Sequence, residues 1–321
     1  MAGPEMRQVG VEPVERSEEA TALGLVEVVG QLPRLLRLRT RLSRAIRAYA
    51  PDVVVTIDSP GLLLRVGKRA MSDGYPVIHW GCPQVWAWRP GRISQLSASM
   101  NALMCLLPFE PALFEGTGLP AYFVGHPAAR AEPEPLPEAL TFLLAPGSRP
   151  EEIRRHWPVC RRVAQRLRVR HPGCRFVVPV APGLDPSTLR GLDVAHVSGW
   201  TGAHAALVAS GTATLDLAAR GIPMVSIYQV HAVTWLLARR LVTGVEHVSL
   251  PNILAGRDVI PEVLQRLDPQ LLADQMHALL GEKGQQQRAD LAAVVRSLEG
   301  HRAVSRAGQI VTAAGRGDLL Y

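Results

Sequence analysis

Short apolar segments alternate with amphipathic stretches of helical length along most of this chain of 321 residues. The apolar segments have the length of strands and lie at residues 53–57, 77–80, 102–106, 122–124, 142–144, 175–178, 205–208 and 224–228. Strands that alternate with helices in this way are typical of parallel sheets covered by helices. The pattern therefore predicts an α/β fold.

A proline-rich segment at residues 131–137 interrupts the alternation. Its sequence, AEPEPLP, places three prolines within five residues and can continue neither a helix nor a strand. We therefore expect two Rossmann-like domains that face each other across a cleft, an N-terminal one at 1–136 and a C-terminal one at 137–321. The sequence leaves open whether the last helices pack back on the N-terminal domain.

The composition limits the class of partner. Hydrophobic residues make up 47% and charged residues 20% of the sequence, as in soluble globular proteins. The formal net charge of +7 suits an anionic partner, such as a nucleic acid, an acidic lipid or a phosphorylated substrate. The sequence contains no recognisable signal peptide and no apolar segment of membrane-spanning length.

Four cysteines are present, Cys82, Cys105, Cys160 and Cys174. None forms a CxxC pair, and no cluster of His, Asp, Glu or Cys has the sequence spacing of a metal site. We therefore expect reduced, buried thiols in a cytosolic protein, and neither a metal nor a cofactor.

The segment SGTATLD, at residues 210–216, has the composition of a phosphate-binding turn. It follows an apolar run and begins a helix, whose first N–H groups lack partners within the helix and lie at the positive end of its dipole. The residues expected to contact a phosphate are Ser210, Gly211, Thr212 and Thr214. Asp216, one turn into the helix, is placed for the hydroxyl pair of a ribose. The alternative is an ordinary capped helix.

A second loop of this kind, APGSRPEE at residues 145–152, also joins an apolar run to a helix. Gly147 and Ser148 supply backbone and hydroxyl donors, and the guanidinium of Arg149 matches the geometry of a diphosphate. The alternative is a solvated arginine in an ordinary loop. Because the two loops are separated by about one β-α-β unit, together they predict a cradle for a nucleotide diphosphate in the C-terminal half.

Asp58 follows the apolar run at 53–57 and precedes a Ser-Pro-Gly turn. Sites in α/β proteins lie at the carboxyl ends of parallel strands. A carboxylate held there and partly desolvated is a stronger base, so we interpret Asp58 as a general base. The alternative is an aspartate that caps the next helix.

Further aromatic and polar residues lie near predicted strand ends. Trp86, Trp88 and Arg89, in the segment VWAWRPGR, are suited to hold a sugar, an acyl chain or a phosphate, although tryptophans are often core residues. Glu110 and His126 are polar residues in apolar surroundings, and we place both at the substrate cleft. A purely structural role is the alternative for His126.

The segment at residues 23–49 combines arginines with an apolar face. Apolar residues recur at three- and four-residue steps from Leu35 to Tyr49, and six arginines without an acid occupy other positions. A basic amphipathic helix beside apolar residues is typical of proteins that rest on an anionic membrane. A surface helix packed on the sheet is the alternative. The residues expected to contact the membrane are Leu25, Val26, Val28, Val29, Leu32, Leu35 and Leu36.

Over essentially the whole chain, the sequence resembles lipid-A-disaccharide synthases in the segments IDSP, VWAWRPGR, LPFEP, FVGHP, PGSRPEEI, SGTATLD and LPNILAGR, in this order. The resemblance implies the two-domain GT-B fold and a metal-independent, inverting glycosyltransferase. It implies transfer of 2,3-diacylglucosamine from its UDP derivative to 2,3-diacylglucosamine 1-phosphate, which yields UDP and a β-1,6-linked tetraacyl disaccharide phosphate in lipid A biosynthesis. It also implies a peripheral position on the inner face of the cytoplasmic membrane of a Gram-negative bacterium.

The resemblance also assigns roles to particular residues. Asp58 matches the family's proposed base, and Arg149 matches the arginine that contacts the diphosphate. Asn252 matches the asparagine of the family's LPN loop and is expected to contact UDP. Asp216 stands where the family usually has the longer Glu. The expected partners are the two lipid substrates and an anionic membrane surface, without nucleic acid; a homodimer is left open.

The start of the chain departs from the family pattern. The family begins with a strand, a loop of the form GExSGD and a helix, whereas MAGPEM resembles a segment downstream of these. We therefore expect the first β-α unit to be missing, through a misplaced start or a real truncation; the latter would expose a sheet edge. Two alternatives to the transferase stay open: an enzyme like UDP-GlcNAc 2-epimerase, and an inactive remnant that binds only nucleotide or membrane.

Overall fold

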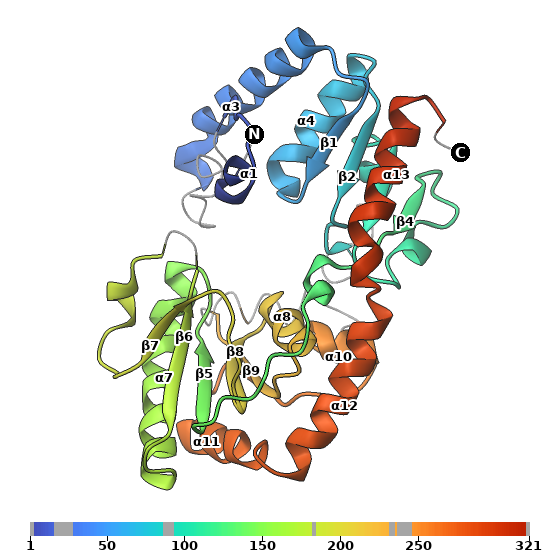
Figure 1. Cartoon of the computed structure of the whole chain (residues 1–321). Coiled ribbons are helices and arrows are strands. Elements are labelled where there is room, and N and C mark those ends of the chain that lie inside the picture. Colours follow the sequence, from blue (N-terminus) through green and yellow to red (C-terminus); the bar gives the residue numbers. More distant parts are fainter. Residues whose placement is uncertain are drawn as a thin grey trace. The chain divides into compact units, whose positions relative to one another are not determined.

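The structure, a computed structural model, describes residues 3–15, 28–85, 93–181, 184–230, 235 and 246–318. The chain forms two compact units, and each is built on a parallel sheet (Figure 1). Unit 1 comprises Met1–Val124 and Arg302–Tyr321, and unit 2 comprises Gly125–His301. The predicted α/β fold class is confirmed.

Unit 1 contains a four-stranded parallel sheet in the order β1-β2-β3-β4. Its strands are β1 Val54–Ile57, β2 Val77–Trp80, β3 Ala102–Cys105 and β4 Ala121–Phe123. Each strand coincides, to within a residue or two, with an apolar run that predicted it. The β2 and β3 runs are continuous rather than alternating because helices cover both faces of the sheet.

The described helices of unit 1 are α1 Pro4–Gln8, α3 Val28–Tyr49, α4 Pro60–Ser72, α6 Ile93–Leu96, η2 Pro111–Phe114 and α13 Ala303–Gly315. One face of the sheet packs on α4, where Val77 of β2 joins Ala70 in a single cluster. Leu38 of α3 packs on α4 in turn. The opposite face packs on α13, where Ile78 meets Ala307.

Unit 2 contains a six-stranded parallel sheet in the order β10-β9-β8-β5-β6-β7. Its strands are β5 Thr141–Ala145, β6 Arg175–Val180, β7 Ala195–Ser198, β8 Ala205–Ala209, β9 Met224–Tyr228 and β10 Glu262–Leu264. Its described helices include η3 Pro127–Arg130, α7 Pro150–Arg170, η4 Pro186–Leu189, α8 Ala213–Ala219, α10 Leu250–Ala255, α11 Pro269–Ala278 and α12 Glu282–Ser297. A short turn, η5 Gly300–Arg302, leads into α13.

The sheet of unit 2 is covered on both faces. Residues of α7 and α11 join β5, β6 and β8 in one hydrophobic cluster, and residues of α8 and α12 join the other face in a second. The central strands β5 and β8 are therefore buried along their whole length. The proline-rich segment 131–137 forms neither helix nor strand and lies within unit 2, where the N–H of Glu134 donates to the carbonyl of Arg220 at 3.1 Å.

Strand β1 forms one edge of the sheet of unit 1, and β2 is the one described strand that pairs with it. Its side chains alternate between buried and exposed, and the exposed ones are apolar: 38% of Val55 and 50% of Ile57 is accessible. No helix in the described part of the chain is long and apolar enough to span a bilayer.

Candidate functional site

Asp58 lies immediately after β1, at the carboxyl edge of the sheet of unit 1. Its N–H donates to the carbonyl of Trp80 at 3.0 Å, which extends the β1–β2 pairing by one residue. Both Asp58 (φ 49°) and Ser59 (φ 47°) have left-handed backbone conformations. For residues other than glycine such a conformation costs about 1–3 kcal/mol, and residues strained in this way cluster at functional sites.

The side chain of Asp58 is exposed, so the expectation that it is partly desolvated is wrong for this structure. Nor does Asp58 occupy the cap of the following helix, because Ser59 is the N-cap residue of α4. The turn thus presents a carboxylate to solvent at the strand end, where a hydroxyl group of a substrate has access to it.

A buried histidine lies beneath this turn. His79 of β2 is paired in register with Thr56 of β1, and its Nδ1 is 2.7 Å from the Thr56 hydroxyl. Nε2 of His79 has no hydrogen-bond partner among the described residues. Burial lowers the pKa of His79 to about 4, although the negative charge of Asp58 raises it. His79 is therefore neutral near pH 7, and sequence patterns did not single it out.

Of the other residues predicted at the substrate cleft, some lie outside the described residues and some make structural contacts. Trp86, Trp88 and Arg89 lie outside the described residues. Glu110 is buried, and its Oε2 accepts hydrogen bonds from the N–H groups of Leu106 and Leu107 at 3.0 and 2.9 Å. Its prediction as a substrate contact is corrected, because this carboxylate stabilises the turn after β3.

His126 is a structural residue, the alternative that its sequence context left open. It is buried, its Nδ1 accepts from the N–H of Ala128 at 3.1 Å, and its own N–H donates to the carbonyl of Leu298. The preceding Gly125 has φ 97°, and a Cβ there would lie 2.7 Å from the carbonyl oxygen of Glu299. The GHP turn is thus fixed against the end of α12, and its assignment to the cleft is corrected.

His79 and His126 predict a loss of stability in acid. Burial lowers the pKa of both His79 and His126 from the usual 6.5 to about 4. Below pH 6.5 each of these histidines is protonated in the unfolded chain but stays neutral in the folded chain. The free energy of unfolding therefore falls as the pH is lowered from 6.5 to 4. Each histidine contributes about 3 kcal/mol at most. Urea unfolding at several pH values should show this decrease in the free energy of unfolding with falling pH.

Substitution of the histidines separates their contributions. His126→Gln should flatten the pH dependence of the free energy of unfolding of unit 2, although its stability at pH 7 also falls. The exposed His301 provides the control, since His301→Gln should leave the slope unchanged. An identical slope in the His126 and His301 variants would contradict the assignment.

The predicted phosphate loops of unit 2 lie next to each other. Strands β5 and β8 are neighbours, and Ala145 at the end of β5 is in register with Val208 of β8. Because parallel strands end at the same edge of a sheet, the loops after β5 and β8 emerge side by side. This is the arrangement that one diphosphate needs in order to contact both loops.

The loop after β5 is organised by a glutamate. Glu152 Oε2 accepts from the N–H groups of Ser148 and Arg149 at 3.0 and 3.3 Å. Gly147 has φ 122°, and a Cβ there would lie 2.5 Å from Glu152 Oε2. The guanidinium of Arg149 is 80% exposed and contacts Glu152 at 3.2 Å. The predicted backbone donor of Ser148 and the amide of Arg149 are thus bound within the loop, whereas the Arg149 side chain is at the surface.

A third buried histidine, His156, supports this loop, and the sequence patterns did not single it out. Nδ1 of His156 is 2.8 Å from the carbonyl of Pro146, and its Nε2 accepts from the N–H of Gln229 at 3.2 Å. Burial lowers the pKa of His156, so the neutral ring donates at Nδ1 and accepts at Nε2. His156 therefore ties the loop after β5 to the end of β9.

The loop after β8 has an exposed backbone. Gly211 and Thr212 are exposed, and their N–H groups have no hydrogen-bond partner within the described part of the chain. A Cβ placed on Gly211 would meet no atom within 4 Å. Thr214 is fully buried and its hydroxyl donates to the carbonyl of Gly211 at 2.7 Å, so its predicted hydroxyl contact with a phosphate is corrected. Ser210 Oγ donates to the carbonyl of Val248 at 3.2 Å.

Asp216 lies in the first turn of α8. Burial raises its pKa, and the nearby Arg220, at 3.8 Å, lowers it. The side chain keeps 29% of its surface accessible. It is therefore open to a hydroxyl donor such as a ribose.

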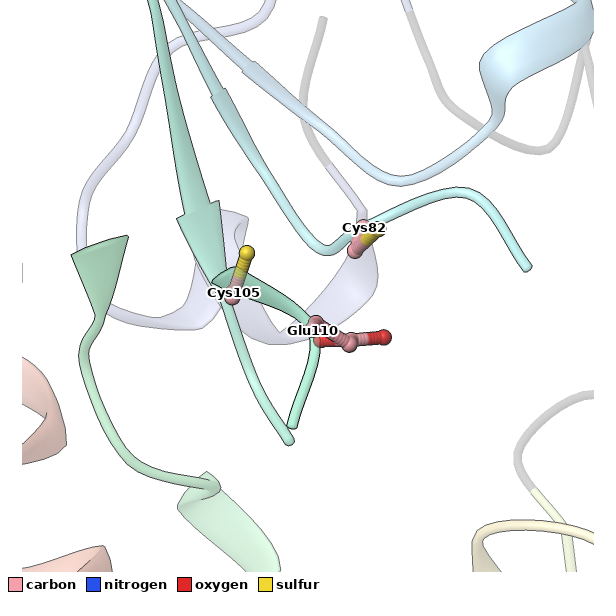
Figure 2. Close-up of side chains that lie close together, drawn as sticks. All are labelled: Cys82, Cys105 and Glu110. Carbon is pink, nitrogen blue, oxygen red and sulfur yellow. The ribbon is translucent and has the colours of Figure 1, made fainter. Parts of the chain in front are cut away.

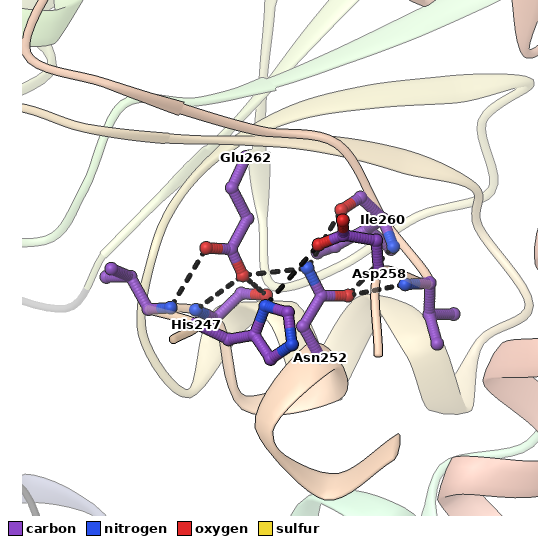
Figure 3. A network of polar contacts seen from close by, with 8 residues as sticks. His247, Asn252, Asp258, Ile260 and Glu262 are labelled. Atoms are coloured by element: carbon purple, nitrogen blue, oxygen red, sulfur yellow. Dashed lines mark hydrogen bonds and ion pairs between the residues drawn. The ribbon is translucent and has the colours of Figure 1, made fainter. Parts of the chain in front are cut away.

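Asn252 lies within α10 rather than on a loop, and its side chain is completely buried. Its Nδ2 donates to the carbonyl of Ile260 and to Glu262 Oε1, at 2.9 and 2.8 Å (Figure 3). Its Oδ1 accepts from the N–H groups of Val259 and Ile260. All polar atoms of the side chain are engaged, so the predicted contact with UDP is corrected.

The network around Asn252 instead positions the loop after β8. Glu262 accepts from the N–H groups of Val248 and Ser249, both at 2.9 Å. Val248 in turn accepts the hydrogen bond of Ser210. Asn252 and Glu262 thus fix the segment that contacts Ser210.

Helix α3 has the predicted basic character. Arg34, Arg37 and Arg44 are exposed, while Leu38 is buried against α4, so one apolar side of the helix packs on the unit. Leu35 is half-buried and Leu36 is 42% exposed. Of the other predicted membrane residues, Leu25 and Val26 lie outside the described residues, and Val28, Val29 and Leu32 belong to α3 without described side chains.

Solved structures share the fold at low sequence identity. A UDP-GlcNAc 2-epimerase from Neisseria meningitidis bound to UDP-GlcNAc has a TM-score of 0.60 and 10% identity, with 96% of this chain and 86% of that chain covered. The spinosyn rhamnosyltransferase SpnG has a TM-score of 0.56 and 16% identity, with 88% and 79% covered. These similarities show the GT-B fold.

Sequence comparisons show the family. The model of the lipid-A-disaccharide synthetase family matches residues 1–314. A lipid-A-disaccharide synthase from Anaeromyxobacter dehalogenans is 38% identical over 318 residues, which cover 92% of this chain and 82% of the relative. Another, from Pseudomonas aeruginosa, is 37% identical over 311 residues, with 89% and 82% covered. The chain therefore belongs to the lipid-A-disaccharide synthetase family.

Proposed function

We propose that this chain transfers 2,3-diacylglucosamine from UDP-2,3-diacylglucosamine to 2,3-diacylglucosamine 1-phosphate, with release of UDP. The observation that carries the proposal is that the loops after β5 and β8 lie side by side. The match of residues 1–314 to the lipid-A-disaccharide synthetase family supports it. The loop after β5 offers the Arg149 guanidinium, and the loop after β8 offers the exposed N–H groups of Gly211 and Thr212, for which no described residue is an acceptor.

The experiment is an assay of the purified chain with both lipid substrates, in which UDP and the disaccharide phosphate are measured. Turnover that needs both substrates would support the proposal. Conversion of UDP-GlcNAc alone to its manno epimer would identify an epimerase instead. Binding of UDP without turnover would identify an inactive nucleotide-binding protein.

In the proposed complex, unit 2 binds the UDP part of the donor. The diphosphate contacts the Arg149 guanidinium and the N–H groups of Gly211 and Thr212, which are exposed. Asp216 takes the ribose hydroxyls. The amides of Ser148 and Arg149 bind Glu152 in this structure, so they are not assigned to the diphosphate.

This assignment predicts that Arg149→Ala weakens UDP binding by about 10–100-fold, because a hydrogen bond to a charged group contributes about 1.5–3 kcal/mol. Isothermal titration with UDP measures the effect. Arg154→Ala is the matched control, since Arg154 is also exposed and also contacts a glutamate of α7, Glu151. Equal affinities of the two variants would contradict the assignment.

The chemical step is an in-line displacement at C1 of the donor sugar. Asp58 of unit 1 accepts the proton of the acceptor 6-hydroxyl while its oxygen forms a bond to C1 from the face opposite the diphosphate. The bond between C1 and the diphosphate oxygen breaks, and the configuration inverts. The charge that develops on the diphosphate is stabilised by Arg149 and the amides after β8, which are in place before the reaction.

We further propose that α3 and the segment before it bind the chain to an anionic membrane surface, at the inner face of the cytoplasmic membrane. The support is the row of exposed arginines on α3 together with exposed Leu36. Arginines near an anionic bilayer each contribute about 1 kcal/mol to binding. A peripheral position would let the acyl chains stay in the bilayer during transfer.

Replacement of Arg34, Arg37 and Arg44 by Gln should therefore weaken binding to vesicles that contain an acidic phospholipid by about 100-fold, at about 1 kcal/mol per arginine. Sedimentation with the vesicles measures this, and raised salt should reproduce the loss in the original chain.

The control removes the same charge elsewhere. Arg154, Arg162 and Arg166 are exposed on α7 of unit 2, and their replacement by Gln should leave vesicle binding nearly unchanged. Equal losses in both triple variants would show that net charge, rather than α3, controls the association.

A further inference from the structure

Two thiols and a carboxylate converge at the carboxyl edge of the sheet of unit 1. Figure 2 shows Cys82 on the segment after β2, Cys105 at the end of β3, and Glu110 at the start of η2. The sulfur atoms and a carboxylate oxygen all lie within 4.8 Å of one another. Sequence spacing did not indicate this cluster, because Cys82 follows β2 and meets Cys105 and Glu110, which lie close together at the end of β3 and just after it, only in the fold.

We propose that Cys82, Cys105 and Glu110 form a binding site for one thiophilic divalent cation of the zinc class. This proposal goes beyond the glycosyl transfer and assigns the cation no part in it. Thiolates select zinc and similar soft ions, whereas magnesium and calcium prefer sites made only of oxygen. Two sulfurs and one carboxylate oxygen are three of the four ligands of a tetrahedral ion, with a water molecule as the usual fourth.

The geometry requires only small side-chain movements. Bonds of about 2.3 Å to sulfur and about 2.1 Å to oxygen separate the ligand atoms of a tetrahedral ion by about 3.5–3.8 Å. In this structure the three ligand atoms lie within 4.8 Å of one another, so each pair would have to approach by about 1 Å at most. Cys82, which donates weakly to the carbonyl of Pro83 at 3.3 Å, would turn away from that carbonyl to bind the ion.

The surroundings fix two of the ligands in place. The carboxylate of Glu110 is oriented by the N–H groups of Leu106 and Leu107, as outer-shell donors orient metal-binding carboxylates elsewhere. The backbone of β2 and β3 is joined beside Cys105 by the hydrogen bond from Gly81 N–H to Met104 carbonyl, at 2.9 Å. Cys105 is buried and Cys82 is half-buried, so an ion can enter at Cys82.

Without an ion, the environment of Cys82 favours its neutral thiol. The hydrogen bond to Cys105, burial and the charge of Glu110 all raise the pKa of Cys82. A divalent cation bound to these groups instead favours the thiolate over the thiol, because it stabilises thiolates by direct bonds. Binding therefore forms two metal–sulfur bonds and one metal–oxygen bond and releases two protons, one from each thiol, to the solvent.

The test uses the full chain, reduced with a phosphine and stripped of metal, with Co²⁺ as the probe. We expect one Co²⁺ per chain, a thiolate-to-cobalt charge-transfer band with tetrahedral d–d bands, displacement by Zn²⁺, and the release of about two protons per ion. Cys82→Ser should lower the affinity by at least about 10–100-fold, the loss that even outer-shell changes cause. Circular dichroism verifies that this variant is folded.

Matched variants complete the design. Cys174→Ser removes a buried thiol of unit 2 that lies outside the cluster, and it should leave the cobalt spectrum unchanged. Glu110→Gln keeps an acceptor for the two amides and should weaken binding while the thiolate band persists. The proposal fails if the reduced chain shows no thiolate band or if Cys82→Ser binds as the original does. It also fails if air oxidation joins Cys82 to Cys105 in a chain that takes up no metal under reducing conditions.

Discussion

Replacement of Asp58 by Asn should lower kcat by about 10²–10⁴-fold, the contribution of a positioned general base. An amide of the same shape cannot accept the proton of the acceptor hydroxyl. Asn also tolerates the left-handed backbone at this position (φ 49°), so the turn keeps its conformation. The rate of UDP release under saturating substrates measures the effect, and UDP affinity should stay the same because unit 2 is unchanged.

The control for this variant is Asp52→Asn. Asp52 is exposed and lies before β1, at the opposite end of the strand from Asp58, so the same loss of charge occurs away from the proposed reaction. We expect nearly full activity. Equal rates for the Asp58 and Asp52 variants would remove Asp58 from the chemical step, whereas a loss of UDP affinity in the Asp58 variant would show a wider disturbance.

Replacement of Asn252 by Ala should lower the free energy of unfolding of unit 2 by about 3–5 kcal/mol. The substitution leaves the amides of Val259 and Ile260 and the carbonyl of Ile260 without their partner in a buried place. Each unsatisfied buried group costs about 1–3 kcal/mol. Glu262 also loses a donor. Urea unfolding, followed by hydrogen exchange of peptides from β9 and β10, measures the loss.

Asn101→Ala is the matched control in unit 1. Asn101 Oδ1 accepts one hydrogen bond, from the N–H of Val77 at 2.8 Å, so its loss should cost about 1–3 kcal/mol and leave unit 2 unaffected. If Asn252→Ala were as stable as the original chain, the network of Figure 3 would not support the loop after β8.

The family, the GT-B fold class and the glycosyltransferase activity inferred from the motifs are confirmed by the family model, the relatives and the solved structures. Inner strands were predictable because a strand covered on both faces needs a continuous apolar run, as in β8. The two strands that the sequence missed form the edges of the sheet of unit 2. β7 is polar and largely exposed, and β10 has only three residues.

The site was predictable as loops but not as individual contacts. Residue types marked the turns after β5 and β8, and these turns lie side by side. Whether a side chain faces solvent depends on partners that the local sequence does not reveal. The Thr214 hydroxyl bonds to a carbonyl of its own turn, and Asn252 on α10 bonds to Glu262 of β10. The roles of Asp58, Arg149 and Asp216 stay predictions for the experiments above.

The outer side of β1 has a consequence for handling the protein. The N–H groups of Val54 and Asp58 donate to the carbonyls of Pro76, just before β2, and Trp80 at its end. Because N–H groups alternate in direction along a strand, those of Val55 and Ile57 face outward, and the side chains of these two residues are exposed. A row of this kind is a template on which any extended peptide can add, including the same strand from a second molecule. At high concentration the protein should therefore self-associate through the outer edge of β1, and the substitution Val55→Lys should prevent this association.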